Sequence, residues 1–277
     1  MDHFSAADWA VFDRQGYLRL GRIADAIMLD AMCQRIDDIM LGKARVDYAR
    51  MLMQLDSDDG SYESAGEQTR GFKGATKNYR KIEQLELDDV FRSYMTLPVF
   101  EAVARHFYGD IAVAAYRAMF MNKPAGKGTW LPLHQDRWRA LDRDPLVTIY
   151  TALDAATPEN GCVELIAGTH HRILNPDHPH GFLTAGMAAT FNNDPRRIQL
   201  TLEPGEVVLM HNWTIHGSGV NRSSAPRRAF SVCLMDAATM SLRYRRPVTR
   251  SALFEARRSC TAVPASPGLV PRSTLLP

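Results

Sequence analysis

The sequence predicts a mainly β protein with added helices, built on a β-sandwich or jelly-roll core. Two observations support this class. Short apolar runs recur after residue 111, namely IAVAAYRAMFM, PLVTIYTAL, CVELIA, EVVLMH and RAFSVCLM. Turn signals separate several of them, among them Pro158-Glu159-Asn160-Gly161, Pro204-Gly205 and Ala225-Pro226. Short runs bounded by glycine and proline are typical of strands in sandwiches and barrels.

Three helices are predicted in the first 108 residues, at 5–15, 24–41 and 86–108. The first has Ser5 at its N-cap and Asp8 three residues later, as in a capping box. The third is interrupted at Pro98, because proline breaks the interior of a helix. The second repeats an apolar residue at every fourth position, which predicts a buried face made of Met28, Met32, Ile36 and Met40.

The chain is expected to form a single domain over residues 1–258, with a helical part at 1–108 and the jelly-roll core at about 109–240. Residues 55–80 are polar and contain glycines, which predicts a long loop. Loops of this length are often lids or binding loops, and the alternative is a mobile, solvated segment. Residues 259–277 combine prolines with small residues and little periodicity, which predicts a disordered tail.

The composition is that of a globular protein, with 45% hydrophobic and 23% charged residues. A net charge of +2 is too small for a nucleic-acid-binding surface. The chain has no apolar run of about 18 residues, and MDHFSAADWAVFDRQGY at its start lacks the apolar segment of a signal peptide. We therefore expect a cytoplasmic protein with a small-molecule substrate and without nucleic-acid or membrane partners. The oligomeric state is open, with a homodimer as one option.

The cysteines give no sign of a metal ribbon or a redox pair. The chain has four, and none belongs to a CxxC motif: Cys33, Cys162, Cys233 and Cys260. A zinc ribbon or a thioredoxin-like site would need such pairs. We therefore predict buried thiols in a reducing compartment.

The sharpest motif for chemistry is His134-Gln135-Asp136. Residues i and i+2 of an extended segment point to the same side, so His134 and Asp136 can reach one ion. His216 lies 82 residues later, after the apolar run EVVLMH, and a second strand could bring it to the same ion. Two imidazoles and one carboxylate on one face of an octahedron leave positions open for other ligands. This is the facial triad of non-haem Fe(II) oxygenases.

An HxD tripeptide alone is a weak motif, because the chain has nine histidines and many acidic residues. The alternative is a loop histidine that only hydrogen-bonds to a neighbour. The metal hypothesis therefore depends on what surrounds the motif in the sequence.

Arg227 stands eleven residues after His216, at the head of the run RRAFSVCLM. Strand alternation places an arginine and small residues on one face: Arg227, Ala229, Ser231 and Cys233. The opposite face carries Arg228 and bulky apolar residues. A guanidinium pairs with a carboxylate through two parallel hydrogen bonds, so Arg227 could hold a small dianion inside the core. Ser218 could add a hydroxyl bond to the same ligand.

Several segments together resemble the phytanoyl-CoA dioxygenase family: HQD, LVTIYTAL, DAATPENGCVELIAGTHH and EPGEVVLMHNWTIHGSGVNRSSAPRRAF. Members commonly have an HxD, an ENG turn, a G-S/T-H element, and a distal His with Ser two and Arg eleven residues later. The resemblance covers about residues 80–235. It implies a double-stranded β-helix, a cupin-like jelly roll with helices packed on one side. It also implies an Fe(II)- and 2-oxoglutarate-dependent dioxygenase that uses O2 and releases succinate and CO2.

The resemblance implies roles for single residues. His134, Asp136 and His216 match the iron ligands. Tyr150 stands where some relatives have tryptophan, and Lys81 resembles a lysine upstream of a similar "KI…L…D..F" segment. Contacts to 2-oxoglutarate are thereby implied for Arg227, Ser218, Tyr150, Met119 and Lys81. His170 matches a recurrent family histidine, for which we expect a structural role.

Substrate contacts are predicted from nearness to these positions, for Arg117, Gln135, Trp138, Met121 and Lys73. Met121 departs from relatives that have asparagine at this position, which leaves the cosubstrate contacts open. The loop at 55–80 is the candidate lid, with Tyr62, Glu63, Gln68, Arg70 and Lys73. Halogenases related to the family have Gly or Ala in place of Asp136, so a carboxylate here favours hydroxylation, desaturation or ring formation.

Two other functions remain open from the sequence. One is a cupin-like metal-dependent isomerase or hydrolase that uses no 2-oxoglutarate. The other is a relative that binds a ligand without turnover. The positions of Arg227 and Ser218 disfavour the first, and the intact triad disfavours the second. The basic candidates Arg117, Lys81 and Lys73 favour an anionic or polar substrate.

Overall fold

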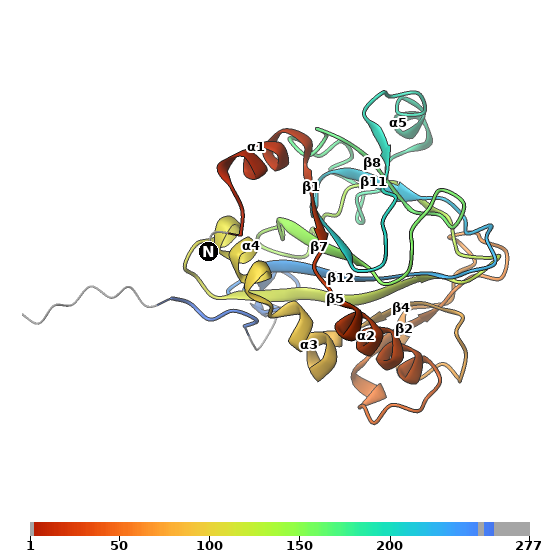
Figure 1. The fold of residues 1–277 in the computed structure, drawn as a ribbon. Coiled ribbons are helices and arrows are strands. Elements are labelled where there is room, and N and C mark those ends of the chain that lie inside the picture. Colours follow the sequence, from red (N-terminus) through yellow and green to blue (C-terminus); the bar gives the residue numbers. More distant parts are fainter. Residues whose placement is uncertain (1–2, 249–251, 258–277) are drawn as a thin grey trace, which may run out of the picture.

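Two antiparallel sheets form the core of the computed structural model, which describes residues 3–248 and 252–257. The larger sheet has the strand order β1-β10-β7-β12-β5-β4-β2-β3, and the smaller one β6-β11-β8-β9 (Figure 1). A third, two-stranded sheet pairs β13 (Met240–Ser241) with β14 (Arg246–Pro247). The mainly β jelly-roll class predicted from the sequence is confirmed.

The larger sheet combines strands from distant parts of the chain. The long central pair is β5 with β12, and both run across the molecule in Figure 1. The bounds of its strands are β1 Tyr17–Arg22, β2 Leu52–Leu55, β3 Thr69–Arg70, β4 Tyr79–Glu83, β5 Val113–Lys123, β7 Val147–Ala152, β10 Glu206–His211 and β12 Arg227–Asp236. Four of these strands lie in the first 108 residues, so the part predicted as helical also extends the sheet.

The smaller sheet lies opposite the larger one. Its strands are β6 Leu131–His134, β8 Val163–Ile166, β9 Arg197–Gln199 and β11 Ile215–Ser218. Between the two sheets lies an apolar cluster that includes Tyr150, Val208 and Ala229 from the larger sheet and Val163 and Leu165 from the smaller one. The short helix α5 (Ala185–Ala189) stands out beyond β8 and β11 (Figure 1).

The remaining helices cover the outer face of the larger sheet. They are α1 Ala6–Gln15, α2 Ala26–Met40, α3 Asp89–Met95 and α4 Pro98–Tyr108, with short 3-10 turns η1 Tyr48–Arg50 and η2 Leu85–Leu87. The predicted capping box at Ser5 is present, and the predicted break at Pro98 separates α3 from α4. Met32, Ile36 and Met40 are buried as predicted, while Met28 is only partly buried.

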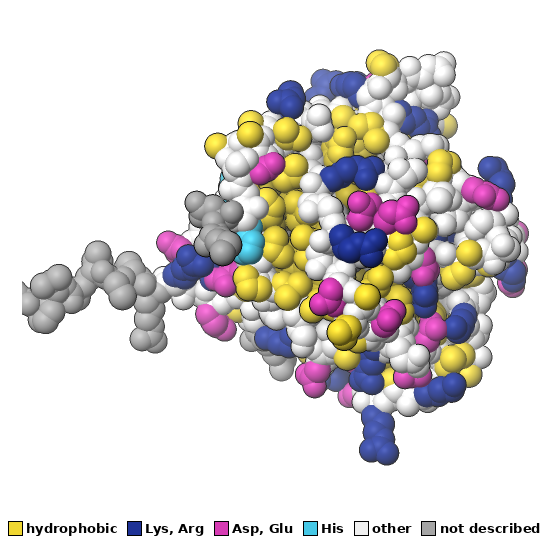
Figure 2. Space-filling view, viewed as in Figure 1, with side chains coloured by type: hydrophobic (Ala, Val, Ile, Leu, Met, Phe, Trp, Pro, Cys, Tyr) yellow, Lys and Arg dark blue, Asp and Glu magenta, His cyan; other side chains and the backbone are white. Residues whose placement is uncertain are grey.

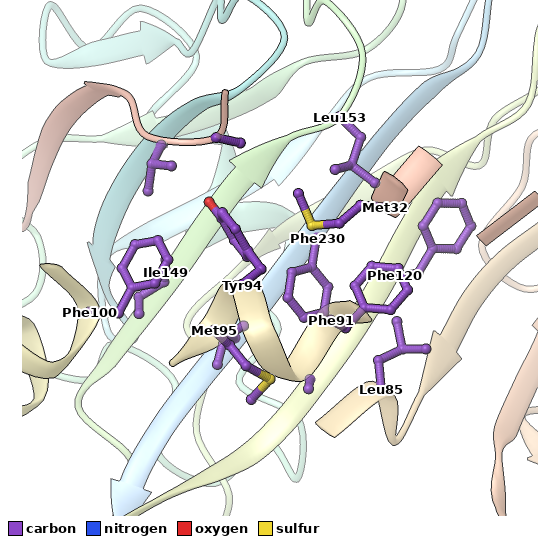
Figure 3. Packing of buried hydrophobic residues seen from close by; sticks show 14 of the residues in the cluster. Met32, Leu85, Phe91, Tyr94, Met95, Phe100, Phe120, Ile149, Leu153 and Phe230 are labelled. Atoms are coloured by element: carbon purple, nitrogen blue, oxygen red, sulfur yellow. The ribbon is translucent and has the colours of Figure 1, made fainter. Parts of the chain in front are cut away.

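Aromatic side chains join these helices to the sheet. Phe91 and Tyr94 of α3 pack on Phe230 of β12, with ring centroids 4.8 Å and 6.1 Å apart (Figure 3). Phe120 of the neighbouring strand β5 is also fully buried in this cluster. Aromatic pairs at this spacing stabilise a core beyond the area that they bury. The sheet is thereby held rigid on the side away from the site.

Positive and negative side chains are interspersed on the face shown in Figure 2, in keeping with the small net charge. Within the described residues, no helix is both long and apolar enough to span a membrane. Cys162 and Cys233 are buried as predicted, whereas Cys33 is partly exposed. Cys260 and the predicted tail at 259–277 lie outside the described residues.

Candidate metal and cosubstrate site

Two paired strands of the smaller sheet bring the predicted triad together. His134 ends β6 and pairs directly with His216 of β11. Asp136 follows two residues later, and its backbone N–H donates to the carbonyl of Asn212 at 2.7 Å. The carboxylate of Asp136 lies 3.7 Å from Nε2 of His134 and 3.8 Å from Nε2 of His216. One ligand atom from each residue therefore lies within 4.8 Å of the others.

Backbone carbonyls orient both imidazoles. Nδ1 of His134 lies 2.9 Å from the carbonyl of Pro132, and Nδ1 of His216 lies 2.9 Å from the carbonyl of Thr214. A carbonyl only accepts, so each Nδ1 carries the proton and donates it. This tautomer leaves the lone pair of each Nε2 directed at the common point, as in metal-binding histidines whose second nitrogen is held by the protein.

Burial also favours the neutral, metal-binding form of the His134 imidazole. Desolvation and the neighbouring His216 lower the pKa of His134 to about 3, so its imidazole is neutral and able to bind a metal. Two imidazoles and one carboxylate, gathered on one side, are the donor set that fits Fe(II) and leaves other positions open.

A cavity of about 270 Å³ opens in front of the triad. Its opposite wall is the inner face of the larger sheet, where side chains from five neighbouring strands, β10, β7, β12, β5 and β4, stand in rows. One row contains Tyr150, Ser231 and Met119, and the next contains Thr148, Cys233 and Arg117. The face of β12 predicted to point inward does so, and its opposite face packs on the helices.

Arg227 lies at one end of this wall and is buried. Its guanidinium donates to the hydroxyl of Tyr150 at 2.7 Å and to the carbonyl of Gly161 at 3.1 Å. Its Nε is buried and has no hydrogen-bond partner among the described residues. A buried guanidinium without a carboxylate partner is unusual, because charge burial normally needs compensation. The arrangement fits the distal carboxylate of 2-oxoglutarate.

The turn Glu159-Asn160-Gly161 corresponds to the ENG turn of the phytanoyl-CoA dioxygenase family, and it supports Arg227. Gly161 has φ +73°, and an added Cβ would lie 2.5 Å from the carbonyl oxygen of Gly219. Asn160 fixes the turn, since its side chain accepts from the backbone of Thr157 and donates to the carbonyl of Ala155. Only glycine therefore lets the chain pass here and present its carbonyl to Arg227.

The other predicted cosubstrate residues also line the cavity: Ser218, Tyr150, Met119 and Lys81. Burial, together with Arg80 and Arg117, lowers the pKa of Lys81 to about 8. Lys123, which continues the alternation of β5, instead lies outside the cavity wall. Its ammonium group donates to the carbonyl of Thr129.

Three of the five predicted substrate residues line the cavity: Arg117, Trp138 and Met121. The other two predicted residues, Gln135 and Lys73, do not line it. Gln135 is fully buried, and its amide bonds the backbone of Arg172, Trp213 and Leu174. Lys73 bonds to Thr69 and lies outside the cavity. Alternation explains the placement of Gln135, because its side chain points away from the side that His134 and Asp136 share.

The polar loop at 55–80 contributes Tyr62 and Gln68 to the cavity wall. Tyr62 contacts Phe182, with ring centroids 5.3 Å apart, and Phe182 lies 5.2 Å from the ring of His134. Neither Phe182 nor the nearby His180 was predicted, because they come from a loop without periodicity. Thr148 was also missed, although it stands two residues before Tyr150 on the same strand face.

His170 is separate from the triad, as its expected structural role requires. Its Nε2 donates to the carbonyl of Asp13 at 3.1 Å and so ties the end of α1 to the loop after β8. The side chain is buried beside Gly16, where an added Cβ would lie 2.5 Å from its Nδ1.

A jelly roll with a His-Asp-His triad facing a buried arginine defines the class of Fe(II)- and 2-oxoglutarate-dependent oxygenases. The family model for phytanoyl-CoA dioxygenase (PhyH) matches residues 12–229. The chain therefore belongs to the phytanoyl-CoA dioxygenase family. It is a 2-oxoglutarate-dependent dioxygenase that requires iron, 2-oxoglutarate and O2. This membership sets aside the isomerase, hydrolase and non-catalytic alternatives.

Sequence relatives include a probable phytanoyl-CoA dioxygenase of Caenorhabditis elegans, 28% identical over 240 residues, which are 82% of this chain and 74% of the relative. The peroxisomal phytanoyl-CoA dioxygenase of Homo sapiens is 32% identical over 166 residues, covering 56% of this chain and 48% of the relative. The chain thus spans about half the length of the human relative that it matches.

Solved structures share the fold. EctD from S. alaskensis, crystallised with 2-oxoglutarate and 5-hydroxyectoine, aligns with a TM-score of 0.68 at 20% identity, over 92% of this chain and 84% of the other. The α-ketoglutarate-dependent carbocyclase SnoK from nogalamycin biosynthesis aligns with a TM-score of 0.65 at 19% identity, over 88% and 87%. At these identities the likeness supports the fold.

Proposed function

We propose that this enzyme hydroxylates, or otherwise oxidises, an unactivated C–H bond of a small metabolite or natural-product intermediate, with release of succinate and CO2. The observation that supports it best is the cavity itself. The triad forms part of one wall, and Arg227 is buried in the opposite wall with Tyr150 and Gly161 as its only described partners.

The residues of the chain would bind and orient the reactants. Bound iron, with 2-oxoglutarate and O2, supplies the oxidising chemistry. His134, Asp136 and His216 would hold the metal on one side. Arg227 and Ser218 would fix the cosubstrate, whose keto acid end then faces the triad. A substrate that fills the cavity would displace water from it, so that oxidation is directed to the bound substrate.

The size of the cavity limits the part of the substrate that can lie beside the triad. About 270 Å³ must accommodate both the cosubstrate and the reacting part of the substrate. A thioester of coenzyme A would have to leave most of its length outside. The mixture of wall residues, with Trp138 and Met121 beside Arg117, fits a molecule that has both apolar and polar parts.

An anaerobic titration of the purified protein with Fe(II) and then 2-oxoglutarate tests this proposal. We expect a weak visible charge-transfer band from chelated 2-oxoglutarate, which should be absent in His134→Ala and His216→Ala. Arg227→Met should weaken 2-oxoglutarate binding at least about tenfold, because it removes charge-assisted hydrogen bonds.

Arg228→Met is the matched control, because it removes the same charge from the next residue, which points to the opposite face. Its affinity for 2-oxoglutarate should remain that of the wild type. Iron binding without the band would contradict the cosubstrate assignment. A wild-type protein that binds no iron would contradict the triad itself.

A further inference from the structure

The inner face of the larger sheet carries arginines at both ends. Along the β5–β12 ladder, Arg227 pairs with Lys123 at one end, and Cys233 pairs with Arg117 at the other. Six residues of regular pairing separate them, which corresponds to about 20 Å of strand. 2-Oxoglutarate is a short dicarboxylate, so a molecule held by Arg227 leaves Arg117 free for another ligand.

Aromatic rings hold the guanidinium of Arg117 in place, and its N–H groups donate no hydrogen bond to the described residues. Its guanidinium lies over the rings of Tyr116 and Trp138, 5.4 Å and 5.6 Å from their centroids. These cation–π contacts support the faces of the group and leave its in-plane N–H groups available. Among the described residues it donates no hydrogen bond, and its side chain is 33% exposed where it lines the cavity.

The nearest carboxylate neutralises Arg117 only in part. Oε1 of Glu83 lies 3.8 Å from Nε of Arg117, beyond hydrogen-bond distance. The same oxygen accepts a hydrogen bond of 2.8 Å from Gln68. A carboxylate arriving through the cavity could therefore form the close, two-pronged pair that Glu83 does not form.

The charges of the whole cavity leave one cation unbalanced. Four cationic side chains line it: Lys81, Arg117, Arg137 and Arg227. Three carboxylates lie in the wall or beside its arginines: Asp136, Glu83 and Asp144. Iron(II) and the 2-oxoglutarate dianion cancel each other. One positive charge therefore remains in the cavity as a whole, which favours an anionic ligand there.

We propose that Arg117 binds an anionic group of the primary substrate, a carboxylate or a phosphate monoester. This inference rests on the proposed function and adds the substrate class, a small organic anion. Trp138 and Tyr116 hold the guanidinium, and the hydrocarbon part of the substrate extends from it toward the triad. The anionic group thereby determines which carbon reaches the oxidising centre.

Matched pairs of probes test this in the holoenzyme with Fe(II) and saturating 2-oxoglutarate. We would compare a series of linear carboxylates with their amides, and alkyl phosphates with the corresponding alcohols. Binding is followed by the change in the visible band of chelated 2-oxoglutarate. Succinate formation on exposure to O2 is the second readout. We expect one anionic series to bind at least about tenfold more tightly than its neutral counterpart.

Two variants test whether Arg117 binds the anionic group of the substrate or only neutralises Glu83. Arg117→Gln should abolish the preference for the anion while leaving the affinity for 2-oxoglutarate within about twofold of the wild type. Glu83→Gln should tighten anion binding, because it removes the competing carboxylate. If Arg117 only served to neutralise Glu83, this second variant would not improve binding.

Three outcomes would overturn the inference. Wild-type enzyme could bind neutral and anionic probes equally, or Arg117→Gln could keep the preference. Arg117→Gln could also weaken 2-oxoglutarate as strongly as Arg227→Met does, which would make Arg117 a cosubstrate residue. Failure of the proposed function looks different, since the visible band would then be missing before any probe is added.

Discussion

At the scale of single residues, the cosubstrate end of the cavity depends on a backbone carbonyl. Within the part of the chain that the structure describes, Arg227 has two hydrogen-bond partners, and one of them is the carbonyl of Gly161. That carbonyl is in place because a glycine with positive φ lets the turn pass the backbone of Gly219. The glycine of the ENG turn thus has two effects. It leaves space for the backbone of Gly219, and it presents a carbonyl that accepts a hydrogen bond from Arg227.

We predict that Gly161→Ala weakens both folding and 2-oxoglutarate binding. The new Cβ would lie 2.5 Å from a backbone oxygen, and the positive φ is itself unfavourable for alanine. The expected cost is about 1–3 kcal/mol in the free energy of unfolding. Affinity for 2-oxoglutarate should fall about tenfold as Arg227 loses its support. Denaturant titration and the visible band measure the two effects.

Gly186→Ala provides the control for this prediction. Gly186 lies within α5, and an added Cβ there meets nothing within 4 Å. Its replacement should be neutral or slightly stabilising, because alanine favours a helix more than glycine does. Equal losses in the two variants would mean that the position of Gly161 has no special role.

The triad and Arg227 could be predicted from the sequence because their chemistry and spacing are specific. Because His134 and Asp136 point to one side of an extended segment, Gln135 between them points away from the cavity. The prediction of a substrate contact for Gln135 did not take this alternation into account. Tyr62 and Gln68 were named only as lid candidates. Phe182 could not be predicted, because its position depends on a loop that folds over the smaller sheet.

At the scale of elements, β12 divides two tasks between its faces. Arg227 points into the cavity, while Arg228 points to the helical side. The guanidinium of Arg228 bonds both oxygens of Asp154 at 2.8 Å and reaches Asp37 of α2 at 3.0 Å. These hydrogen bonds raise the pKa of Arg228, so it stays charged. One side chain thereby joins β12, the end of β7 and α2.

We predict that Arg228→Met destabilises the fold by about 2–4 kcal/mol, because it leaves Asp154 and Asp37 without their shared partner. Iron and 2-oxoglutarate affinities should stay within about twofold of the wild type. Chemical denaturation gives the stability and the visible band gives the affinity. A loss of cosubstrate binding equal to that of Arg227→Met would show that the two faces are not independent.

At the scale of the whole molecule, a buried group of histidines limits stability in acid. His211 ends β10, and its ring lies 5.0 Å from that of His170. Its Nδ1 accepts a hydrogen bond from the backbone of Trp213. Burial, with His170 and His171, lowers the pKa of His211 to about 4. The folded state therefore takes up this proton less readily than the unfolded chain does.

We predict that the contribution of His211 to stability is complete above pH 6.5 and is lost as the pH falls toward 4. In that window the unfolded chain binds more protons, so acid favours unfolding. The loss attributable to His211 should approach about 3 kcal/mol. His211→Asn keeps an acceptor for Trp213 but has no proton to gain.

Urea unfolding of both proteins between pH 4 and pH 7.5 measures this effect. The free energy of unfolding of the variant should fall less steeply with acid, by about 1.4 kcal/mol per pH unit at most. Parallel curves for the wild type and the variant would contradict the prediction. His134 also has a lowered pKa, but it is present in both proteins and cancels in the comparison.

The overall fold was predictable where strands are long and apolar. The five runs quoted above correspond to β5, β7, β8, β10 and β12. The short or polar strands β1 to β4, β9 and β11 were missed or seen only in part. Their pairing depends on partners far away in the sequence, as when β1 joins β10. Local patterns cannot specify such partners, and β1 to β4 account for the sheet in the part predicted as helical.

The cavity wall has one more consequence, which concerns the lifetime of the enzyme. Four sulfur-containing side chains face the place where oxygen is activated: Met119, Met121, Met210 and Cys233. Burial raises the pKa of Cys233 to about 12, so its thiol is protected, but methionine is oxidised without ionising. Turnover in the absence of substrate would therefore convert wall methionines to sulfoxides, which the masses of their peptides would reveal. A substrate that fills the cavity would therefore protect these methionines from oxidation.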